Sequence, residues 1–188
     1  MREEGGEMRL NVCVTPLLLL IMFAAPGCGS EAAGEVADDI ETGNAITVQN
    51  FNMTWNLNNG AVEITMSAPT TGWIAVGFEP SSAMKDANII IGYIADEEVF
   101  ISDDWGDGFI SHRADTDLGG SSDVSVISGS EADGTTEITF SIPLDSGDSY
   151  DKTLEAGESY KVILAFGPDE SDDFQGYHVW AETIELEL

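Results

Sequence analysis

Stretches in which apolar residues occupy every second position recur from about residue 45 to the C-terminus. The stretches with this alternation are Ala61–Ser67, Asp123–Ile127, Thr136–Ile142, Tyr160–Phe166 and Thr183–Leu188. A period of two places neighbouring side chains on opposite faces of a β-strand, so each stretch predicts a strand that buries one face. In the second stretch, Val124 and Val126 are the residues expected to point inward.

Two further stretches are rich in β-branched and aromatic residues, and a polar loop joins them. They are Trp73–Phe78 and Ile89–Ile94, and both are predicted to be strands. The second carries isoleucine on both faces, as a strand covered on both sides would. In the loop between them, Met84 is a long apolar residue among polar neighbours, and no strand pattern explains its position. Met84 therefore either fills a gap above the sheet or offers its sulfur as a ligand.

Turn signals separate the predicted strands. They are Asn58-Asn59-Gly60, Asp133-Gly134 and Ser146-Gly147-Asp148. No segment has a helical period, apart from about one turn around Ser82–Asp86. Many short strands without helices predict an all-β domain of roughly ten strands, either a β-sandwich or a closed barrel.

The first 27 residues have the pattern of a bacterial lipoprotein signal peptide. The apolar run Leu17–Ala25 is too short to span a bilayer, and Pro26-Gly27-Cys28 follows it. Cys28 is then expected to become the lipidated first residue of an exported, periplasmic or cell-surface protein; an ordinary secretory peptide is the alternative. Residues 28–44 are acidic and predict a flexible tether, which leaves 45–188 as the folded domain.

The chain is strongly acidic, with 35 acidic and 6 basic residues and a formal net charge of −29. Such a charge repels nucleic acid and anionic lipid headgroups, so a membrane is expected to be reached only through the lipid anchor. It favours cationic partners, or high salt that screens self-repulsion. Both cysteines, Cys13 and Cys28, precede the predicted domain, which therefore has no disulfide.

The candidate chemistry is sparse, because the chain has only two histidines. His112 lies in a polar segment and is expected to be a solvated surface imidazole. His178 lies among aromatic residues after an acidic loop and is a candidate ligand. No Gly-x-Ser-x-Gly elbow, cysteine-based zinc spacing or Cys-x-x-Cys-His haem attachment is present, so no catalytic site emerges and an enzyme is not predicted.

The acidic segment Asp103–Gly108 is predicted to be a turn. It lacks the third-position Asp and the distal Glu of a calcium-binding loop. Trp105 within it is a candidate platform for stacking a sugar ring.

Several motifs in sequence order resemble the DOMON domain family. They are Gly72–Phe78, Met84–Tyr93, Asp117–Gly120, Phe140–Leu144, Ala165–Gly167 and a late histidine, His178. The resemblance covers about Ile46–Leu188 and implies an antiparallel β-sandwich. Many relatives have Arg before the proline of the Phe140–Leu144 motif, where this chain has Ile142, so any role of that Arg does not transfer.

Members of this family, such as the b-type cytochrome domain of cellobiose dehydrogenase, bind haem b through one Met and one His; others are proposed to bind sugars. The resemblance therefore implies haem b held non-covalently by Met84 and His178, and electron transfer to a redox partner protein. The aromatic residues that could surround the haem are Trp73, Phe78, Tyr93, Tyr177 and Trp180. A haem-free module that binds carbohydrate or protein is the alternative.

Lipid anchoring can be tested at Cys28. Because this residue ends a small-residue cleavage region, the full-length protein is expected in the membrane fraction, with a lipid on Cys28. Cys28→Ser should prevent lipidation and leave unprocessed precursor or a soluble product. Mass spectrometry that finds an unmodified Cys28, or cleavage elsewhere, would contradict the lipoprotein interpretation.

Overall fold

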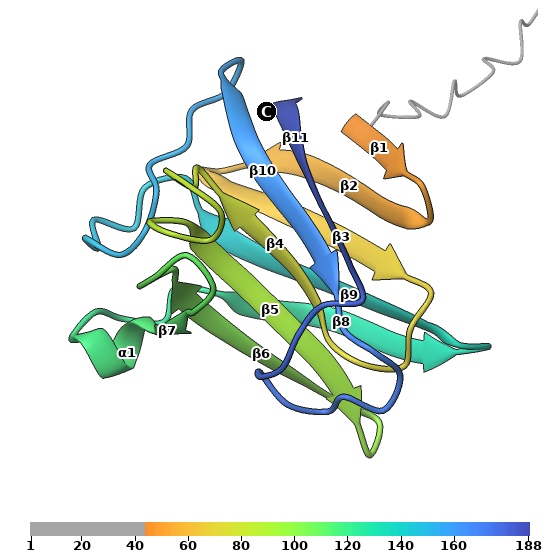
Figure 1. Cartoon of the computed structure of the whole chain (residues 1–188). Coiled ribbons are helices and arrows are strands. Elements are labelled where there is room, and N and C mark those ends of the chain that lie inside the picture. Colours follow the sequence, from red (N-terminus) through yellow and green to blue (C-terminus); the bar gives the residue numbers. More distant parts are fainter. Residues whose placement is uncertain (1–43) are drawn as a thin grey trace, which may run out of the picture. The chain divides into compact units, whose positions relative to one another are not determined.

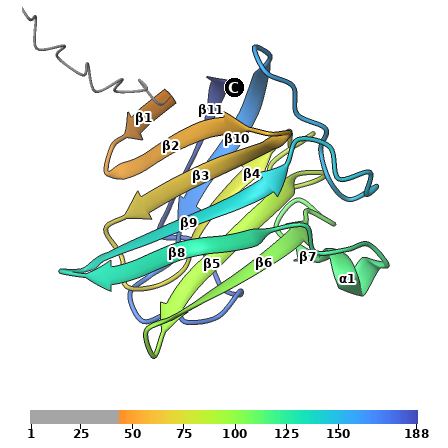
Figure 2. The same cartoon turned by 180° about the vertical axis from the view of Figure 1, so that it is seen from behind.

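The computed structural model describes residues 44–188, which form two facing antiparallel sheets (Figures 1 and 2). The predicted signal peptide, the tether and Cys28 lie outside the described residues. One sheet has the order β1 (Asn44–Val48), β2 (Phe51–Asn58), β3 (Ala61–Ala68), β9 (Thr135–Pro143), β8 (Ser125–Ala132). The other has the order β11 (Trp180–Glu187), β10 (Ser159–Phe166), β4 (Ile74–Phe78), β5 (Asn88–Ala95), β6 (Glu98–Trp105), β7 (Arg113–Ala114). These eleven strands confirm the predicted all-β sandwich.

The only helix among residues 44–188 is α1 (Asp115–Leu118), a single turn. In this part of the chain no helix has the length and hydropathy of a membrane span. The expected helical turn at Ser82–Asp86 is instead a tight non-helical turn closed by a bridge between Ser82 and Lys85. Left-handed backbone angles at Ala83 and Asp86, with φ of 50° and 63°, prevent a right-handed helix there.

The main core lies between the two sheets and follows the predicted alternation. Ile138, Phe140 and Ile142 of β9 are buried, and so are Val162 and Leu164 of β10. Burying each such side chain contributes about 1.5–3 kcal/mol to folding. The core therefore comes from the residues that the period of two selected.

Two hairpins end in the turns that the sequence indicates. Asn59 and Gly60 have φ of 49° and 84°, and Asp133 and Gly134 have φ of 52° and 74°. Two successive left-handed residues are what a two-residue hairpin turn needs, because its twist matches that of the strands. These turns fix the register of β2 with β3 and of β8 with β9.

Strands β4 and β5 are buried on both faces, as the isoleucine pattern predicts. Ile74, Val76 and Phe78 point into the main core, together with Ile90. On the other face a second, smaller cluster forms; its buried members are Trp73, Ala75, Ala87, Ile89, Ile91 and Ala165. The six-stranded sheet therefore has an outer face that also needs cover.

The structure differs from the expected strand at Asp123–Ile127. Strand β8 begins at Ser125, all eight of its residues are exposed, and Val126 is 44% exposed. The reason is that β8 is an edge strand and its pairing with β9 shifts between Val126 and Ser128, so the alternation does not continue. Only Val124, just before the strand, packs against the core.

Asp103–Gly108 also differs from its expected turn. Strand β6 continues through Trp105, and both Asp103 and Asp104 are buried. Trp105 is not an open platform, because Tyr150 packs edge-on against it and Lys152 Nζ lies 4.8 Å from its ring centroid. Strand pairing to β5 and β7 overrides the turn chemistry of the acidic residues.

Candidate functional site

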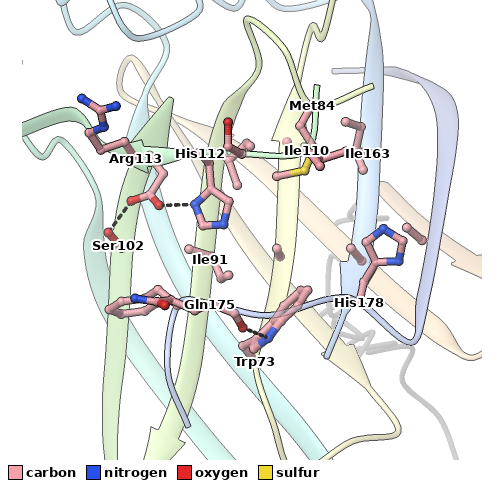
Figure 3. A pocket seen from close by; sticks show the side chains of 18 of the residues that line it. Trp73, Met84, Ile91, Ser102, Ile110, His112, Arg113, Ile163, Gln175 and His178 are labelled. Atoms are coloured by element: carbon pink, nitrogen blue, oxygen red, sulfur yellow. Dashed lines mark hydrogen bonds and ion pairs between the residues drawn. The ribbon is translucent and has the colours of Figure 1, made fainter. Parts of the chain in front are cut away.

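A cavity of about 870 Å³ lies over the outer face of the six-stranded sheet (Figure 3). Its floor consists of outward-facing strand residues, many of them small: Ala75, Gly77, Ile89, Ile91, Ser102, Asp104, Ile163, Ala165, Ala181 and Thr183. Small side chains on the central strands keep the floor low, so the cavity has depth. Its volume is at the upper end of the roughly 300–1,000 Å³ typical of ligand sites.

Three connections form the walls of the cavity. The β4–β5 connection contributes Met84, the β6–β7 connection contributes Phe109 and His112, and the β10–β11 connection contributes Tyr177 and His178. The wall residues Phe109, Ile110 and Tyr177 are 62%, 81% and 84% exposed. Large apolar side chains therefore line an accessible cavity.

Met84 is held by backbone hydrogen bonds of its loop. Ala87 N donates to Met84 O at 3.1 Å, and Met84 N donates to Phe109 O at 3.3 Å. Gly106 exchanges hydrogen bonds with Asp86 and Ala87 at 2.8 and 2.9 Å. A Cβ at Gly106 would overlap the carbonyl of Met84, so this close approach requires glycine. The loop is therefore docked on the β6–β7 connection, and the Met84 side chain lines the cavity.

The same loop contains a polar turn that faces solvent. The Ser81 hydroxyl donates to Asp86 at 2.6 Å and holds the pKa of that carboxyl below its usual range. Lys85 lies 3.7 Å from the same carboxylate. These contacts leave Met84 as the apolar residue of the loop that faces the cavity.

Trp73 is fixed at the start of β4. Its indole Nε1 donates to Gln175 O at 3.1 Å, and Gly167 N donates to Trp73 O at 2.8 Å. A Cβ at Gly167 would overlap the indole ring. Trp73 thus ties the β10–β11 connection, which carries Tyr177 and His178, to the sheet.

Met84 and His178 reach the cavity from opposite ends of the strands. In the antiparallel pair of β4 and β10, Phe78 lies beside Val162 and Ile74 lies beside Phe166. The Met84 loop follows Phe78, whereas the loop of His178 follows Phe166. The two connections therefore fold over the outer face from opposite directions, and His178 is exposed at the cavity.

His112 is a cavity residue that the sequence does not reveal. It is half-buried, and its Nδ1 donates to Asp104 Oδ2 at 2.5 Å. The Ser102 hydroxyl donates to the other oxygen of Asp104, also at 2.5 Å. A carboxylate at Nδ1 orients an imidazole and leaves Nε2 for another partner, as second-shell carboxylates do for ligating histidines. The expectation of a solvated surface imidazole is therefore wrong, because Asp104 orients His112. The sequence gives no local sign of this contact, which depends on the pairing of β6 with β7.

Of the expected aromatic wall, Trp73 and Tyr177 line the cavity and the others do not. Phe78 is fully buried between the sheets, because it shares the inward face of β4 with Ile74 and Val76. Tyr93 points outward but lies under Phe100 and Phe174, each with its ring centroid 5.0 Å away. Trp180 also packs in the sandwich, stacked between the rings of Phe51 and Phe166.

Comparison with known families agrees with the fold. The DOMON domain model matches residues 47–167, which is well over half of the chain. The chain belongs to the DOMON domain family. The match includes Met84 and His112, whereas His178 lies beyond its end. The matched residues therefore include most of the cavity. They also include every strand except β11 and the first residues of β1.

Two solved structures share this DOMON fold. The cytochrome b domain of pyranose dehydrogenase from Coprinopsis cinerea is 13% identical with a TM-score of 0.56, covering 72% of this chain and 75% of that one. The cytochrome domain of Myriococcum thermophilum cellobiose dehydrogenase is 12% identical with a TM-score of 0.55, covering 77% of this chain and 80% of that one. At these identities the likeness is one of fold.

The docking of the Met84 loop can be tested with Gly106→Ala. The new Cβ would displace the loop but leave the sandwich core intact, so the melting temperature should fall by roughly 3–12 °C, for a loss of about 1–3 kcal/mol. Hydrogen exchange at Asp86 and Ala87 should accelerate markedly. Gly108→Ala is the matched control, since its Cβ would meet only the rotatable Ser111 hydroxyl. Unchanged exchange in Gly106→Ala would show that the loop is not held by this contact.

Proposed function

We propose that this protein is an exported, lipid-anchored DOMON domain that binds haem b non-covalently, with Met84 and His178 as axial ligands, and relays electrons. The observation that supports the proposal most is that these two residues, far apart in the sequence, line one cavity from opposite ends of the sheet. Met84 and His178 would hold the haem iron between them, and both side chains line the space in which the group would lie.

The residues of the cavity fit a haem in chemistry and in size. A thioether and an imidazole are the donor pair of Met/His cytochromes. The low floor at Ala75, Gly77 and Ala165 leaves room for a large flat group. Trp73 and Phe109 offer apolar surface to a macrocycle, whereas Arg113, which also lines the cavity, is already paired with Asp107 at 2.9 Å.

When bound, haem would supply a one-electron couple. Met84 and His178 would hold both axial positions and leave none for oxygen or substrate, so we propose an electron carrier that is not itself an enzyme. The walls would exclude water from the bound group. The partner would be a redox protein, and the acidic surface favours one with a cationic docking face.

His112 is a second imidazole in the same cavity, so its role needs its own variant. The carboxylate of Asp104 orients it in the way that supports ligating histidines. A His112 variant therefore cannot serve as a control without effect for the His178 variant. We propose that His112 lies at the edge of the cavity without binding the iron, and that His178 is the histidine ligand.

The alternative function is a haem-free module that binds carbohydrate or protein. The exposed rings of Tyr177 and Phe109 favour it, because rings at a rim can stack on a sugar. Trp105 does not contribute, since Tyr150 and Lys152 cover its ring.

The spectrum of haem-replete protein tests ligation directly. Wild type should show a sharp low-spin b-type spectrum when reduced, with haem extractable by acidic solvent. Met84→Leu keeps the apolar volume but removes the sulfur, so the iron should become high-spin or water-ligated and the potential should fall. Met84→His should restore a low-spin spectrum at a lower potential, since thioether ligation raises the potential.

Loss of haem should be most severe in His178→Ala, because imidazole is the stronger ligand of oxidised iron. His112→Ala should keep a low-spin spectrum. Ile127→Ala, which shortens an exposed apolar side chain of β8 outside the cavity, is the matched control and should leave the spectrum unchanged. Absence of a Soret band in haem-replete protein would refute haem binding, and a shift of tryptophan fluorescence with oligosaccharides would then support the alternative. If His112→Ala abolishes the band while His178→Ala keeps it, the ligand assignment is wrong.

A further inference from the structure

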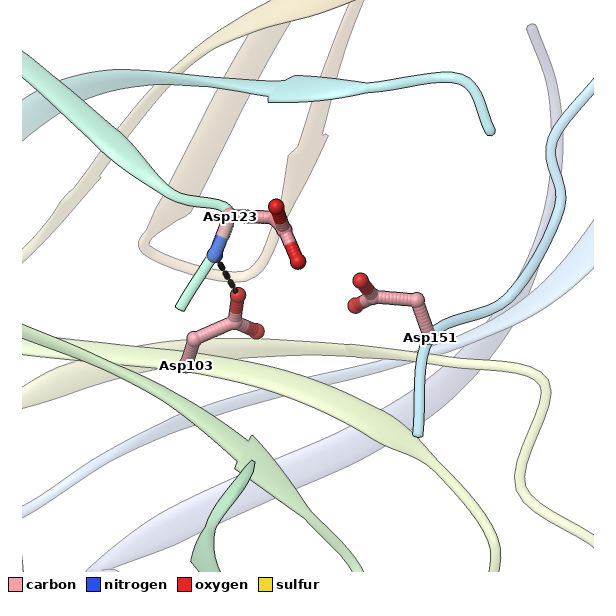
Figure 4. A group of neighbouring side chains, drawn as sticks. All are labelled: Asp103, Asp123 and Asp151. Carbon is pink, nitrogen blue, oxygen red and sulfur yellow. Dashed lines mark hydrogen bonds between the residues drawn. The ribbon is translucent and has the colours of Figure 1, made fainter. Parts of the chain in front are cut away.

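Three carboxylates meet on the side of β6 that faces away from the cavity (Figure 4). Asp103 belongs to β6, Asp123 precedes β8, and Asp151 lies in the β9–β10 connection. One oxygen from each lies within 4.8 Å of those from the other two. Asp103 is 2% exposed, and the other two side chains are half-buried. The fold therefore gathers three acidic groups from separate segments at a protected place.

Hydrogen bonds orient these carboxylates and still leave oxygen atoms free. Asp123 N donates to Asp103 Oδ2 at 2.7 Å, and the Ser146 hydroxyl donates to Asp151 Oδ2 at 2.5 Å. Asp103 Oδ1 is buried and has no hydrogen-bond partner within residues 44–188. An oriented, unpartnered carboxylate oxygen is a ready ligand for a cation.

Asn88 provides an independent sign of a missing ligand. Its side chain is 2% exposed, and its Nδ2 donates to Asp151 Oδ1 at 2.7 Å, so the amide group lies against one of the three carboxylates. Its Oδ1 is buried without a partner in the described part of the chain. A buried amide oxygen left unpaired is costly, and such groups are normally satisfied. Because Oδ1 and Nδ2 belong to the same amide group, an ion bound beside Asp151 could also accept Oδ1 as a ligand.

Asp115 adds a fourth carboxyl group to this region. It is fully buried, and neither of its oxygens has a partner among the described residues. The largest charge effects on it come from Asp103 and Asp151. The ion pairs found in residues 44–188 are Lys85–Asp86, His112–Asp104 and Arg113–Asp107. No Lys, Arg or His among the described residues therefore forms an ion pair with Asp103, Asp115, Asp123 or Asp151.

Burial without a cation affects the ionisation of these groups. Loss of hydration raises the pKa of Asp103 to about 7 and that of Asp115 to about 8. Burial also raises the pKa of Asp151. Buried acids are normally paired or bound to a metal.

We propose that Asp103, Asp123 and Asp151 bind one Ca²⁺ ion, with Asn88 Oδ1 as a further ligand and Asp115 as a buried neighbouring carboxyl group. The donors are all oxygen, which favours a hard cation over zinc or copper. They come from two strands, β5 and β6, and two irregular connections, and this suits the 6–8 flexible ligands of Ca²⁺ better than the rigid octahedron of Mg²⁺. The site is separate from the cavity on the outer face of the sheet. Ser102 and Asp104 line that cavity, whereas Asp103 points to the other side of β6.

Calcium binding is tested on the full chain after chelation, with and without added haem. Roughly 0.5 M NaCl screens diffuse binding to the acidic surface. Calorimetric titration should give one Ca²⁺ per chain and weaker binding of Mg²⁺. At about a hundredfold excess over Kd the melting temperature should rise by roughly 5–10 °C.

Matched variants separate this site from general charge effects. Asp123→Asn and Asp151→Asn should each weaken Ca²⁺ binding at least about tenfold, since each removes a charged ligand. Without calcium, Asp123→Asn should melt no lower than wild type, because it relieves repulsion. Asp133→Asn, in the exposed β8–β9 turn, removes the same charge and should bind Ca²⁺ like wild type.

Terbium luminescence gives a readout that does not depend on stability. Trp105 lies two residues after Asp103, and its ring contacts that of Tyr150, which precedes Asp151. Excitation of these rings should sensitise Tb³⁺ at the site, and Ca²⁺ should quench the emission by displacement. The proposal is overturned if wild type shows no specific calcium response, or if Asp123→Asn and Asp133→Asn respond alike.

Discussion

The need to cover both faces of β4 and β5 governs this structure. Their inner faces are buried by the opposing sheet, and this contact forms the main core. Their outer faces are also apolar, and among residues 44–188 it is three connections that pack over them. Apolar sheet faces are stable only when something packs on them. The cavity is the part of the outer face that the three connections leave uncovered. The site therefore exists because the connections do not fill the space above the sheet.

Close backbone contacts hold the covering connections in place. A Cβ at Gly72 would overlap the carbonyl of Pro168, and one at Gly106 would overlap that of Met84. Gly167 likewise lets the indole of Trp73 lie against the chain. Such contacts fix loops without long side chains, which keeps the volume above the strands free. Met84 and the connection that carries His178 are therefore positioned by glycines that themselves line little of the cavity.

The sequence predicted the strands well, because alternation reports directly which face is buried. The same rule assigns Phe78 to the core, since it lies on the same face of β4 as Ile74 and Val76. The expectation that Phe78 borders the haem came from its aromatic side chain alone. What could not be predicted depends on distant segments meeting. The hydrogen bond of His112 to Asp104 requires β7 to pair with β6. The contact of Asp123 with Asp103 leaves no periodic trace, and the Asp103–Gly108 segment reads locally as a turn.

Strand β6 carries Asp103 and Asp104 in succession, and these residues face opposite sides of the sheet. Their α-carbons are only about 3.8 Å apart, and no layer of side chains separates them. A positive charge accepted on the side of Asp103 would therefore alter the electrostatic potential at Asp104 and at the imidazole that it orients. Thermodynamic linkage makes such an influence mutual. Cation occupancy on one side of the strand and the redox state of a group on the other would then be energetically coupled through two adjacent residues.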